Sequence, residues 1–470
     1  MRGVISFFRR LWVFIDDRTE AIATLRSFLT HAVPPNIGWP YVLGSATLLA
    51  FVMQVVTGIA LATAYIASPD QAYDSLQFIT HELRFGNMLR GMHFYGASAM
   101  FVLISLHAIR TFLYGSYKFP REVNWISGVV LLVLTFIMAW TGQLLRWGET
   151  GVWTVVAGAY TASRFPLIGE YIAQFMLAGS TVGEATLSRF FIFHVLFLPL
   201  LSIAIIAFHI HLVLRHGVSE PPEPDRPVEP ISYRPWYKKM LEERGVPFWP
   251  NAAWRDAVFG TGVVAVVILL ALIFGAVELG QPPDPSRVQV NPQPDWYFWW
   301  YDAMVTLAPP QLEYTTSLLV PLLGFLLLCL LPLVANRGER SPRQRPWAVM
   351  TVALVVALFG WLTYSSRQPH LVPDFSVEPL PAEVVGVDSG PIAEGAQLFY
   401  DKACLYCHDI ASYGGRLGPD LTYVGDRLHP LRMQEIIFVG ARNMPSYLDA
   451  LTVEEMEHLM AFLESRRRGE

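Results

Sequence analysis

Long apolar stretches alternate with short polar connections along most of the chain. Seven of the stretches lack charged side chains over roughly the 17 to 25 residues that a helix needs to cross a bilayer. Apolar helices in soluble cores are usually shorter, so this pattern predicts seven membrane-spanning helices rather than one large soluble core. The stretches are Tyr41–Ile66, Gly91–Ile109, Trp125–Leu145, Phe190–Leu214, Ala257–Val277, Tyr314–Ala335 and Trp347–Tyr364.

Polar and proline-rich segments divide the chain around these stretches. Residues 1–36 mix charged and apolar side chains in an amphipathic pattern, which predicts a helix on the membrane surface rather than a cleavable signal peptide. Residues 37–218 hold four predicted spans, and residues 219–366 hold the other three. A proline-rich tether, residues 367–391, leads to a domain of residues 392–470. The predicted fold class is all-α: an integral membrane helix bundle followed by a small all-α domain.

Composition and charge agree with a membrane protein. Of the 470 residues, 53% are hydrophobic and 16% are charged, which is unusual for a soluble protein. Lysine and arginine gather in the loops on the N-terminal side, and such loops tend to stay cytoplasmic. We therefore expect a multi-pass protein of the bacterial cytoplasmic membrane, with the N-terminus inside and the C-terminal domain outside. The net charge of -5 gives no reason to expect a nucleic-acid partner.

Four histidines lie inside the predicted spans, where ionisable residues are costly and are candidates for function. His93 and His107 are fourteen residues apart on the second span, and His194 and His209 are fifteen apart on the fourth. At 100° and about 1.5 Å per residue, each pair returns to nearly one helix face, about 21 to 22 Å apart along the axis. Two facing helices of this kind predict two b haems, an outer one between His93 and His194 and an inner one between His107 and His209.

Glycines on the first and third spans repeat this spacing. Gly44 and Gly58 are fourteen residues apart, as are Gly128 and Gly142. A residue without a side chain lets a porphyrin edge approach the backbone. Glycines also serve helix packing in membranes, and for either pair alone that explanation is the more common one. The coincidence of four matched spacings favours haem binding.

Other basic residues lie near the same spans. Arg90 and Arg110 flank the second span at its two ends, where a guanidinium could pair with haem propionates. A plain cytoplasmic anchor is an equal alternative for Arg110. His31 and His81 lie outside the spans and His211 on another helix face, so we do not expect them to ligate haem.

The C-terminal domain contains the sequence Cys404-Leu405-Tyr406-Cys407-His408. This is the attachment motif of c-type haem, with two thioether bonds and His408 as the proximal iron ligand. A zinc or dithiol site is disfavoured because the remaining cysteine, Cys329, lies within the sixth span. The segment around Met444 resembles the methionine loop of small class I cytochromes c. That resemblance implies Met444 as the distal ligand, which should raise the haem potential.

At these residues the chain resembles the cytochrome b of cytochrome bc complexes, the quinol:cytochrome c and quinol:plastocyanin oxidoreductases. The segment LRGMHFYGASAMFVLISLHAIRTFLYGSYKFPREVNWISGVVLL is close to the family pattern. The histidine spacing and the seven spans are similar to the chloroplast-type branch, whose four-helix and three-helix parts are separate chains. Here the two parts are fused. The resemblance covers about residues 30 to 365 and implies a quinone-pool substrate, a Rieske iron–sulfur partner and a homodimeric complex.

In that family, quinol is oxidised at the outer face beside a Pro-Glu-Trp-Tyr motif. This chain has the variant Pro-Asp-Trp-Tyr, at 294–297. The resemblance implies that Asp295 accepts a proton from the quinol and that Tyr297 belongs to the same site. Taken alone, the four residues could also form an ordinary turn. Their place in the outer loop between the fifth and sixth spans favours the quinol site.

Two other segments depart from the family. Where relatives usually have T-G-Y-x-L-P-W-[GD]-Q, this chain has Gln143, Arg146 and Glu149 in place of the tyrosine, proline and final glutamine. These changes bear on which quinol fits. Val42 replaces the cysteine that holds an extra haem in the chloroplast-type branch, so we expect no covalent third haem inside the membrane.

The resemblance predicts a quinol:cytochrome c oxidoreductase subunit in a respiratory or photosynthetic chain. One electron from menaquinol or ubiquinol would pass to the Rieske protein, the other to the b haems, and protons would leave on the outer side. The c haem would take the first electron and pass it to a soluble or membrane cytochrome c or a terminal oxidase. Two alternatives stay open: a membrane cytochrome that reduces the c haem without bifurcation, and a transporter or channel with a cytochrome tail.

Overall fold

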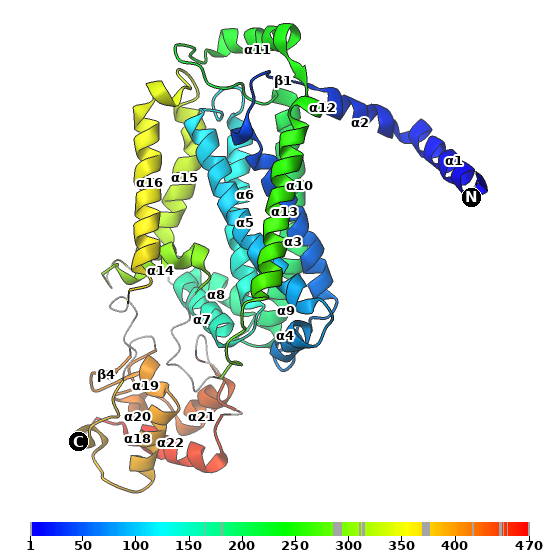
Figure 1. Cartoon of the computed structure of the whole chain (residues 1–470). Helices are drawn as coiled ribbons and strands as arrows, with labels where there is room; N and C mark the ends of the chain where they lie inside the picture. The colour runs from blue at the N-terminus through cyan, green and yellow to red at the C-terminus, as the bar shows by residue number, and fades with distance from the viewer. Residues whose placement is uncertain are drawn as a thin grey trace.

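Helices make up most of the protein. The computed structural model describes residues 2–163, 165–179, 182–284, 294–309, 312, 315–368, 377–415, 418–440, 444, 446–448 and 450–468. Figure 1 shows a long bundle with a smaller helical domain at one end. In the described parts of the chain, strands are limited to two short antiparallel ladders, so the predicted all-α class is confirmed.

Seven helices are long and apolar enough to cross a membrane, as predicted. Between 11% and 28% of each apolar window is fully buried inside the protein, and the other side chains in these windows are partly or fully accessible. The spans are α3 (Leu43–Ala62), α5 (Gly86–Leu113), α6 (Glu122–Leu144), α9 (Glu184–Ile192) continued through η2 (Phe193–Phe197) into α10 (Leu198–His216), α13 (Ala253–Phe274), η5 (Thr315–Leu319) with α15 (Val320–Val334), and α16 (Pro346–Ser365).

Two of the spans contain a widened turn of π-helix. Both widened turns, η2 and η5, end shortly before a proline, Pro199 and Pro321 respectively. A proline ring clashes with the carbonyl four residues earlier and cannot donate to it. A π turn is one way in which a helix accommodates such a residue without ending.

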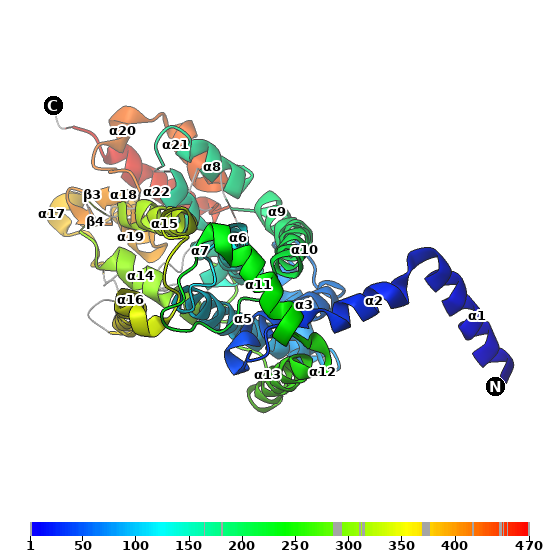
Figure 2. The same ribbon diagram turned by 90° about the horizontal axis from the view of Figure 1, so that it is seen from above.

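The spans pack as two groups, one around α5 and the other around α6. In the first group, α5 packs against α3 and α13. In the second, α6 packs against α10 and α15, and α5 and α6 touch each other. The view from above in Figure 2 shows the same arrangement, with α16 and α15 on the side away from α13. This places the second and fourth spans, which carry the four histidines, on opposite sides of the bundle interior.

Short helices cover both ends of the bundle. Figure 1 shows α4 (Ala72–His81), α7 (Glu149–Ser163), α8 (Gly169–Leu177) and α14 (Trp299–Thr306) at the end next to the C-terminal domain. The opposite end carries α11 (Pro230–Arg244) and α12 (Phe248–Asn251). There β1 (Ala32–Val33) pairs with β2 (Val246–Pro247) and ties the start of the first span to the start of the fifth.

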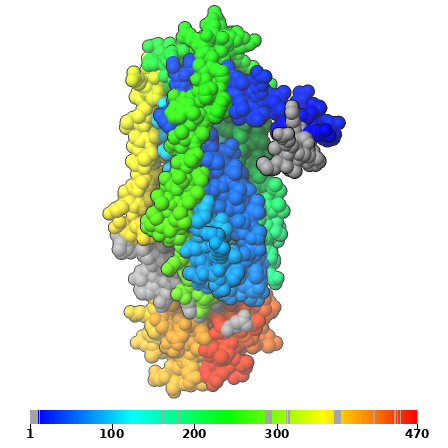
Figure 3. All heavy atoms as spheres, turned by 45° about the vertical axis from the view of Figure 1, so that its right-hand side comes forward, coloured from blue at the N-terminus to red at the C-terminus, as the bar shows by residue number. Residues whose placement is uncertain are grey.

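The N-terminal segment forms α1 (Arg2–Thr19) and α2 (Ala21–Thr30), which meet at Glu20. Glu20 has a φ of 50°, so the two helices do not continue in one line. Figures 1 and 3 show the segment projecting sideways from the bundle. Its location on a membrane surface stays a prediction.

A buried polar network joins the four-helix part to the three-helix part. Arg340 forms an ion pair with Glu220, and its Nη2 donates to the Glu220 carbonyl at 2.8 Å. Tyr233 donates to the other Glu220 carboxylate oxygen at 2.8 Å, and Arg121 donates to the Tyr233 hydroxyl at 2.8 Å. Because breaking a buried pair leaves an uncompensated charge, these contacts favour one arrangement of the two parts.

The C-terminal domain has its own core around α18 (Pro391–Asp401) and α22 (Val453–Ser465). These helices cross closely at Gly395, where an added Cβ would lie 2.0 Å from the His458 carbonyl oxygen. Leu380 and Val385, inside the predicted tether, also contribute to this core. The remaining elements are α17 (Ala382–Val385), α19 (Cys404–Cys407), β3 (Asp409–Ile410), β4 (Tyr413–Gly414), α20 (Val424–Arg427) and α21 (Pro430–Val439).

Candidate functional site

A large cavity runs through the interior of the bundle. Its volume is about 940 Å³, near the upper end of the range of roughly 300 to 1,000 Å³ for small-molecule sites. It extends from Arg110 near one end of α5 to Asp295 and Tyr297 near the other end of the bundle. The residues predicted to bind the b haems all line it: His93, His107, His194, His209, Gly44, Gly58, Gly128, Gly142, Arg90 and Arg110.

His93 on α5 and His194 on η2 face each other across this cavity. Their ring centroids are 6.3 Å apart and their planes are inclined by 78°. One metal ion bound from both sides at about 2.0–2.1 Å, with the half-width of a ring added at each end, gives roughly 6 Å between centroids. The spacing therefore fits one iron held between the two imidazoles.

Hydroxyl groups on the neighbouring helices hold three of the four imidazoles. The Nδ1 atom of His93 lies 2.9 Å from Thr57 Oγ1, that of His194 lies 3.1 Å from Thr141 Oγ1, and that of His209 lies 2.8 Å from Ser127 Oγ. Each hydroxyl lies on α3 or α6, next to the helix that carries its histidine.

These hydrogen bonds set the tautomer. The single proton of each hydroxyl goes to a backbone carbonyl of its own helix, for example from Thr57 to Met53 O at 2.7 Å and from Ser127 to Asn124 O at 2.9 Å. The hydroxyl oxygen must then accept from the imidazole, so Nδ1 carries the proton. The lone pair of Nε2 is left free, as a metal-binding histidine requires.

Each of the four glycines faces one histidine ring. An added Cβ would lie 2.6 Å from the ring of His194 at Gly142, 3.1 Å from His107 at Gly44 and 3.2 Å from His93 at Gly58. At Gly128 the distance to His209 would be 3.5 Å, an ordinary contact. The glycines were predicted to make room for a porphyrin edge, and in the structure their nearest neighbours in the cavity are the imidazoles.

His107 and His209 form the second pair, at the end of the bundle near α11. Both rings line the cavity and interact electrostatically. Beside them the Arg110 guanidinium lies over the Tyr41 ring, 3.7 Å from its centroid. The Nε and Nη2 atoms of Arg110 are buried and have no hydrogen-bond partner among the described residues. Two buried donors without an acceptor fit an anionic group of a ligand, such as a propionate.

Arg90, at the other end of α5, already has protein partners. It donates to Thr80 Oγ1 at 2.6 Å and to the Val277 carbonyl oxygen. Its side chain still lines the cavity, with only 8% of the residue exposed. The two arginines predicted to bind propionates therefore differ, because among the described residues Arg110 has buried donor atoms without a partner, whereas both terminal nitrogens of Arg90 are bonded to the protein.

The Pro-Asp-Trp-Tyr turn meets the end of α6 at the cavity's other end. Asp295 Oδ2 accepts from Arg146 Nη2 at 2.7 Å and from the Tyr297 hydroxyl at 2.8 Å. The backbone N–H of Asp295 donates to Gln143 Oε1 at 3.3 Å. The Tyr297 ring stacks on Phe101 with centroids 4.3 Å apart. Burial, followed by the nearby Asp295 carboxylate, raises the pKa of Tyr297 well above its usual value.

In the C-terminal domain, as in the bundle, a hydrogen bond at Nδ1 determines which ring nitrogen of the histidine is free. His408 Nδ1 lies 2.9 Å from the Pro419 carbonyl oxygen, which can only accept, so Nε2 is again the free nitrogen. An added Cβ on Gly418 would lie 2.6 Å from the His408 ring. Burial raises the pKa of Cys404 to about 12 and that of Cys407 to about 11. Met444 is partly buried and packs against the domain core.

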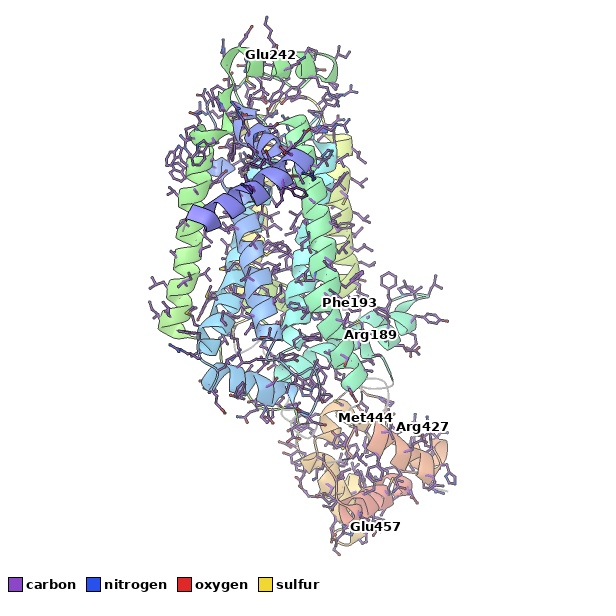
Figure 4. The ribbon with its side chains drawn as sticks, turned by 90° about the vertical axis from the view of Figure 1, so that its right-hand side faces the viewer. Arg189, Phe193, Glu242, Arg427, Met444 and Glu457 are labelled. Atoms are coloured by element: carbon purple, nitrogen blue, oxygen red, sulfur yellow. The ribbon has the colours of Figure 1, made fainter. Side chains whose placement is uncertain are left out.

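The haem-attachment segment lies against the membrane part of the protein. Trp153 on α7 packs with Ala403 and Tyr406, which are 3% and 5% exposed. Figure 4 shows Met444 in this domain and Phe193, the first residue of η2, at the nearby end of the bundle, whereas Glu242 of α11 lies at the far end. The segment Cys404–His408 is therefore on the side of the bundle where His194 and Asp295 lie.

Sequence reasoning missed three features of these sites. The hydroxyl partners could have been found, because Thr57, Ser127 and Thr141 each stand directly before one of the spaced glycines. The widened turn at His194 had a weaker indication in the one-residue difference between the histidine spacings. The bond between Arg146 and Asp295 had no indication in the sequence, since the two residues are 149 positions apart.

Three family models match successive parts of the chain. The family described as "Cytochrome b/b6/petB" matches residues 28–217, and "Cytochrome b(C-terminal)/b6/petD" matches residues 282–380. The family described as "Cytochrome C oxidase, cbb3-type, subunit III" matches residues 390–463. The first of these matches covers the first four spans, and the second begins after the fifth span, α13, and includes the sixth and seventh.

The chain is also similar to individual proteins of the cytochrome b family. Cytochrome b of Rickettsia conorii is 31% identical over 371 residues, which are 77% of this chain and 88% of the relative. Cytochrome b6 of Heliobacterium mobile is 41% identical over 210 residues, 44% of this chain and 99% of the relative. Cytochrome b/c1 of Bradyrhizobium diazoefficiens is 31% identical over 364 residues, 76% of this chain and 50% of the relative.

A solved structure shares the architecture. A chain of a hyperthermophilic respiratory Complex III superposes with a TM-score of 0.63 and 27% identity, covering 76% of this chain and 91% of that one. Together with the sequence matches and the seven apolar helices, this confirms the predicted resemblance. The chain is an integral membrane protein of the cytochrome b family with a cbb3-type cytochrome c domain fused at its C-terminal end.

Proposed function

We propose that this chain is the cytochrome b/c subunit of a quinol:cytochrome c oxidoreductase with bifurcated electron transfer. One observation carries the proposal. The Pro-Asp-Trp-Tyr turn and the altered segment at the end of α6 meet at one end of the same cavity that contains the two facing histidine pairs. A quinol bound there would lie next to both a proton acceptor and the outer haem site.

Four histidines would hold two b haems, His93 with His194 on the outer side and His107 with His209 on the inner side. The free Nε2 atoms and the 6.3 Å between the rings of His93 and His194 support this assignment. The haems, when bound, supply electron transfer across the membrane. Arg110 offers its two free donors to a propionate of the inner haem, and Arg90 lines the outer site.

A single c haem would be attached to Cys404 and Cys407, with His408 as proximal and Met444 as distal ligand. The free Nε2 atom of His408 supports the first role. The partly buried position of Met444 against the domain core agrees with the second. A methionine ligand raises the haem potential, which suits an acceptor of electrons from the quinol side.

At the outer end of the cavity, Asp295 would accept a proton from a quinol hydroxyl, with Tyr297 hydrogen-bonded to the same carboxylate. One electron would go to a Rieske iron–sulfur partner and then to the c haem, and the other to the b haems. A quinone would be reduced near the inner end, where Ser45 donates to Asp256 at 2.8 Å beside the cavity. Protons released outside and taken up inside would account for proton translocation.

The remaining partners and the location complete the proposal. The quinone pool, menaquinone or ubiquinone, would supply the substrate, and a soluble or membrane cytochrome c or a terminal oxidase would accept electrons from the c haem. The complex would be a homodimer in the bacterial cytoplasmic membrane. The N-terminus would be cytoplasmic and the C-terminal domain would lie outside, next to α7 and the quinol site.

Spectroscopy of the purified complex tests the proposal. A pyridine haemochrome measurement should give a b-to-c ratio near two, and an oxidant pulse in the presence of quinol should transiently reduce the b haems. A transporter with a cytochrome tail would contain no b haem. A cytochrome without bifurcation would contain b haem but show no oxidant-induced reduction. A complex without a Rieske subunit would also contradict the proposal.

Asp295→Asn tests the proton acceptor. Loss of a positioned general base lowers a rate by about 10²- to 10⁴-fold, so turnover should fall within that range while haem content stays unchanged. The matched control is Asp70→Asn, which removes an exposed carboxylate from the loop before α4. Turnover of Asp295→Asn equal to that of the control would exclude Asp295 as the acceptor.

A further inference from the structure

Two residues that depart from the family pattern are bonded to each other. Arg146 occupies the position where relatives usually have proline, and Asp295 the position where they usually have glutamate. Their side chains form an ion pair with 2.7 Å between Nη2 and Oδ2. The side chains are 25% and 13% exposed, so the pair lies at the edge of the cavity rather than in open solvent.

We propose that Arg146 is a positioning residue for Asp295, and that it holds the carboxylate in the direction needed to accept a proton from quinol. This inference rests on the proposed function. Asp295 has one methylene fewer than glutamate, so its carboxylate reaches less far from the backbone. The guanidinium of Arg146 supplies a fixed donor that sets the direction of the shorter side chain.

The hydrogen bonds leave a defined face for the substrate. Arg146 and Tyr297 both donate to Oδ2, and the Asp295 N–H donates to Gln143 Oε1, which fixes the backbone. The other carboxylate oxygen, Oδ1, is then the atom offered to a quinol hydroxyl. Oxidation of one quinol releases two electrons and two protons. Asp295 takes one proton as the quinol O–H bond breaks, and the second goes to water on the outer side.

Among the described residues, two side chains are bonded to the Asp295 carboxylate, Arg146 from the end of α6 and Tyr297 from its own turn. Arg90 from α5 lies close enough to interact with Arg146. Arg90 is bonded to Thr80 and the Val277 carbonyl, so it does not replace Arg146.

The test is the rate of quinol oxidation at saturating quinol in the assembled complex. The rate of quinol-driven b-haem reduction is measured for the wild type, Arg146→Gln and Arg146→Lys. In Arg146→Gln the rate should fall by roughly 2- to 150-fold, which corresponds to the coupling of about 0.5 to 3 kcal/mol found between bonded residues. Arg146→Lys keeps a charged donor and should recover most of the rate. Arg84→Gln, an exposed arginine in the loop before α5, is the control and should leave the rate unchanged.

In an Asp295→Asn background, replacing Arg146 should cause no further loss of rate, because the two residues act as a unit. The inference is overturned if Arg146→Gln keeps the rate of the wild type, or if it lowers the rate as much in the Asp295→Asn background as in the wild type. Arg146→Met gives a second neutral side chain should the glutamine variant not assemble, and the same two outcomes apply to it. If the wild type itself shows no oxidant-induced b-haem reduction, or if Asp295→Asn retains full turnover, the proposed function fails as well.

Discussion

Replacing Gly142 by alanine should weaken haem binding at the proposed outer b haem site while leaving the bundle intact. Gly142 is near the end of α6, and its backbone lies against the ring of His194. The added methyl carbon would be 2.6 Å from Cε1, 3.1 Å from Nε2 and 3.3 Å from Nδ1 of that ring. Carbon atoms pack at about 3.5 to 4.0 Å, so the imidazole must move by roughly 1 Å.

The structure allows little room for this movement. Thr141, the residue before Gly142, is bonded to His194 Nδ1 at 3.1 Å, so a shift of the ring weakens that bond as well. Overpacking of this kind costs about 1 to 3 kcal/mol, which corresponds to a loss of roughly 5- to 150-fold in haem affinity. Alanine favours a helix over glycine by about 0.5 to 1 kcal/mol, so α6 itself should not be destabilised.

The other glycines provide a graded control. Gly128→Ala places its methyl group 3.5 Å from the His209 ring and should leave the haem content unchanged. Gly44→Ala and Gly58→Ala, at 3.1 and 3.2 Å, should have intermediate effects. The assay is the b-to-c haem ratio of the purified complex, with the covalent c haem as the internal standard. Retention of both b haems in Gly142→Ala, or an equal loss in Gly128→Ala, would refute the reasoning.

Two further predictions concern the C-terminal domain and the buried network. Met444→Ala should lower the midpoint potential of the c haem without detaching it, as measured by redox titration; an unchanged potential would identify another distal ligand. Glu220→Gln leaves Arg340 buried without its counter-charge and should lower the free energy of unfolding by about 3 to 5 kcal/mol. Its control, Glu242→Gln, removes an exposed ion pair with Lys238 at 3.8 Å. This control should change the free energy of unfolding by less than about 0.5 kcal/mol. Equal thermal stability of the two variants would contradict the second prediction.

Properties that belong to a short stretch of sequence could be predicted well. The seven spans were found because freedom from charge over the thickness of a bilayer is a local property. The four histidines of the cavity were found because helix periodicity links spacing to direction. The same reasoning predicted Gly44, Gly58, Gly128 and Gly142 as a set, and each of them lies against one of those histidines.

Contacts between distant segments could not be predicted from one sequence. Gln143 and Arg146 depart from the family in one segment of the sequence, and Asp295 departs from it in another. Only the folded chain brings them together across 149 positions. The core of the C-terminal domain gives a second example, since Leu380 lies in a proline-rich stretch with the composition of a tether and yet packs into that core.

The widened turn at His194 explains why the two histidine pairs differ in spacing. In a uniform α-helix, fourteen residues turn by 40° short of a whole number of turns, whereas fifteen residues overshoot by about 60°. His93 and His107 on α5 have the first spacing, so a uniformly α-helical fourth span would point one of its histidines about 100° away from its partner. The π turn at Phe193–Phe197 absorbs one extra residue and restores the phase. Pro199, two residues beyond the turn, makes a regular α-helical turn unfavourable at this place. The extra residue and the proline therefore belong together: the proline favours a widened turn, and the fifteen-residue spacing is the one that such a turn requires for both histidines to face α5.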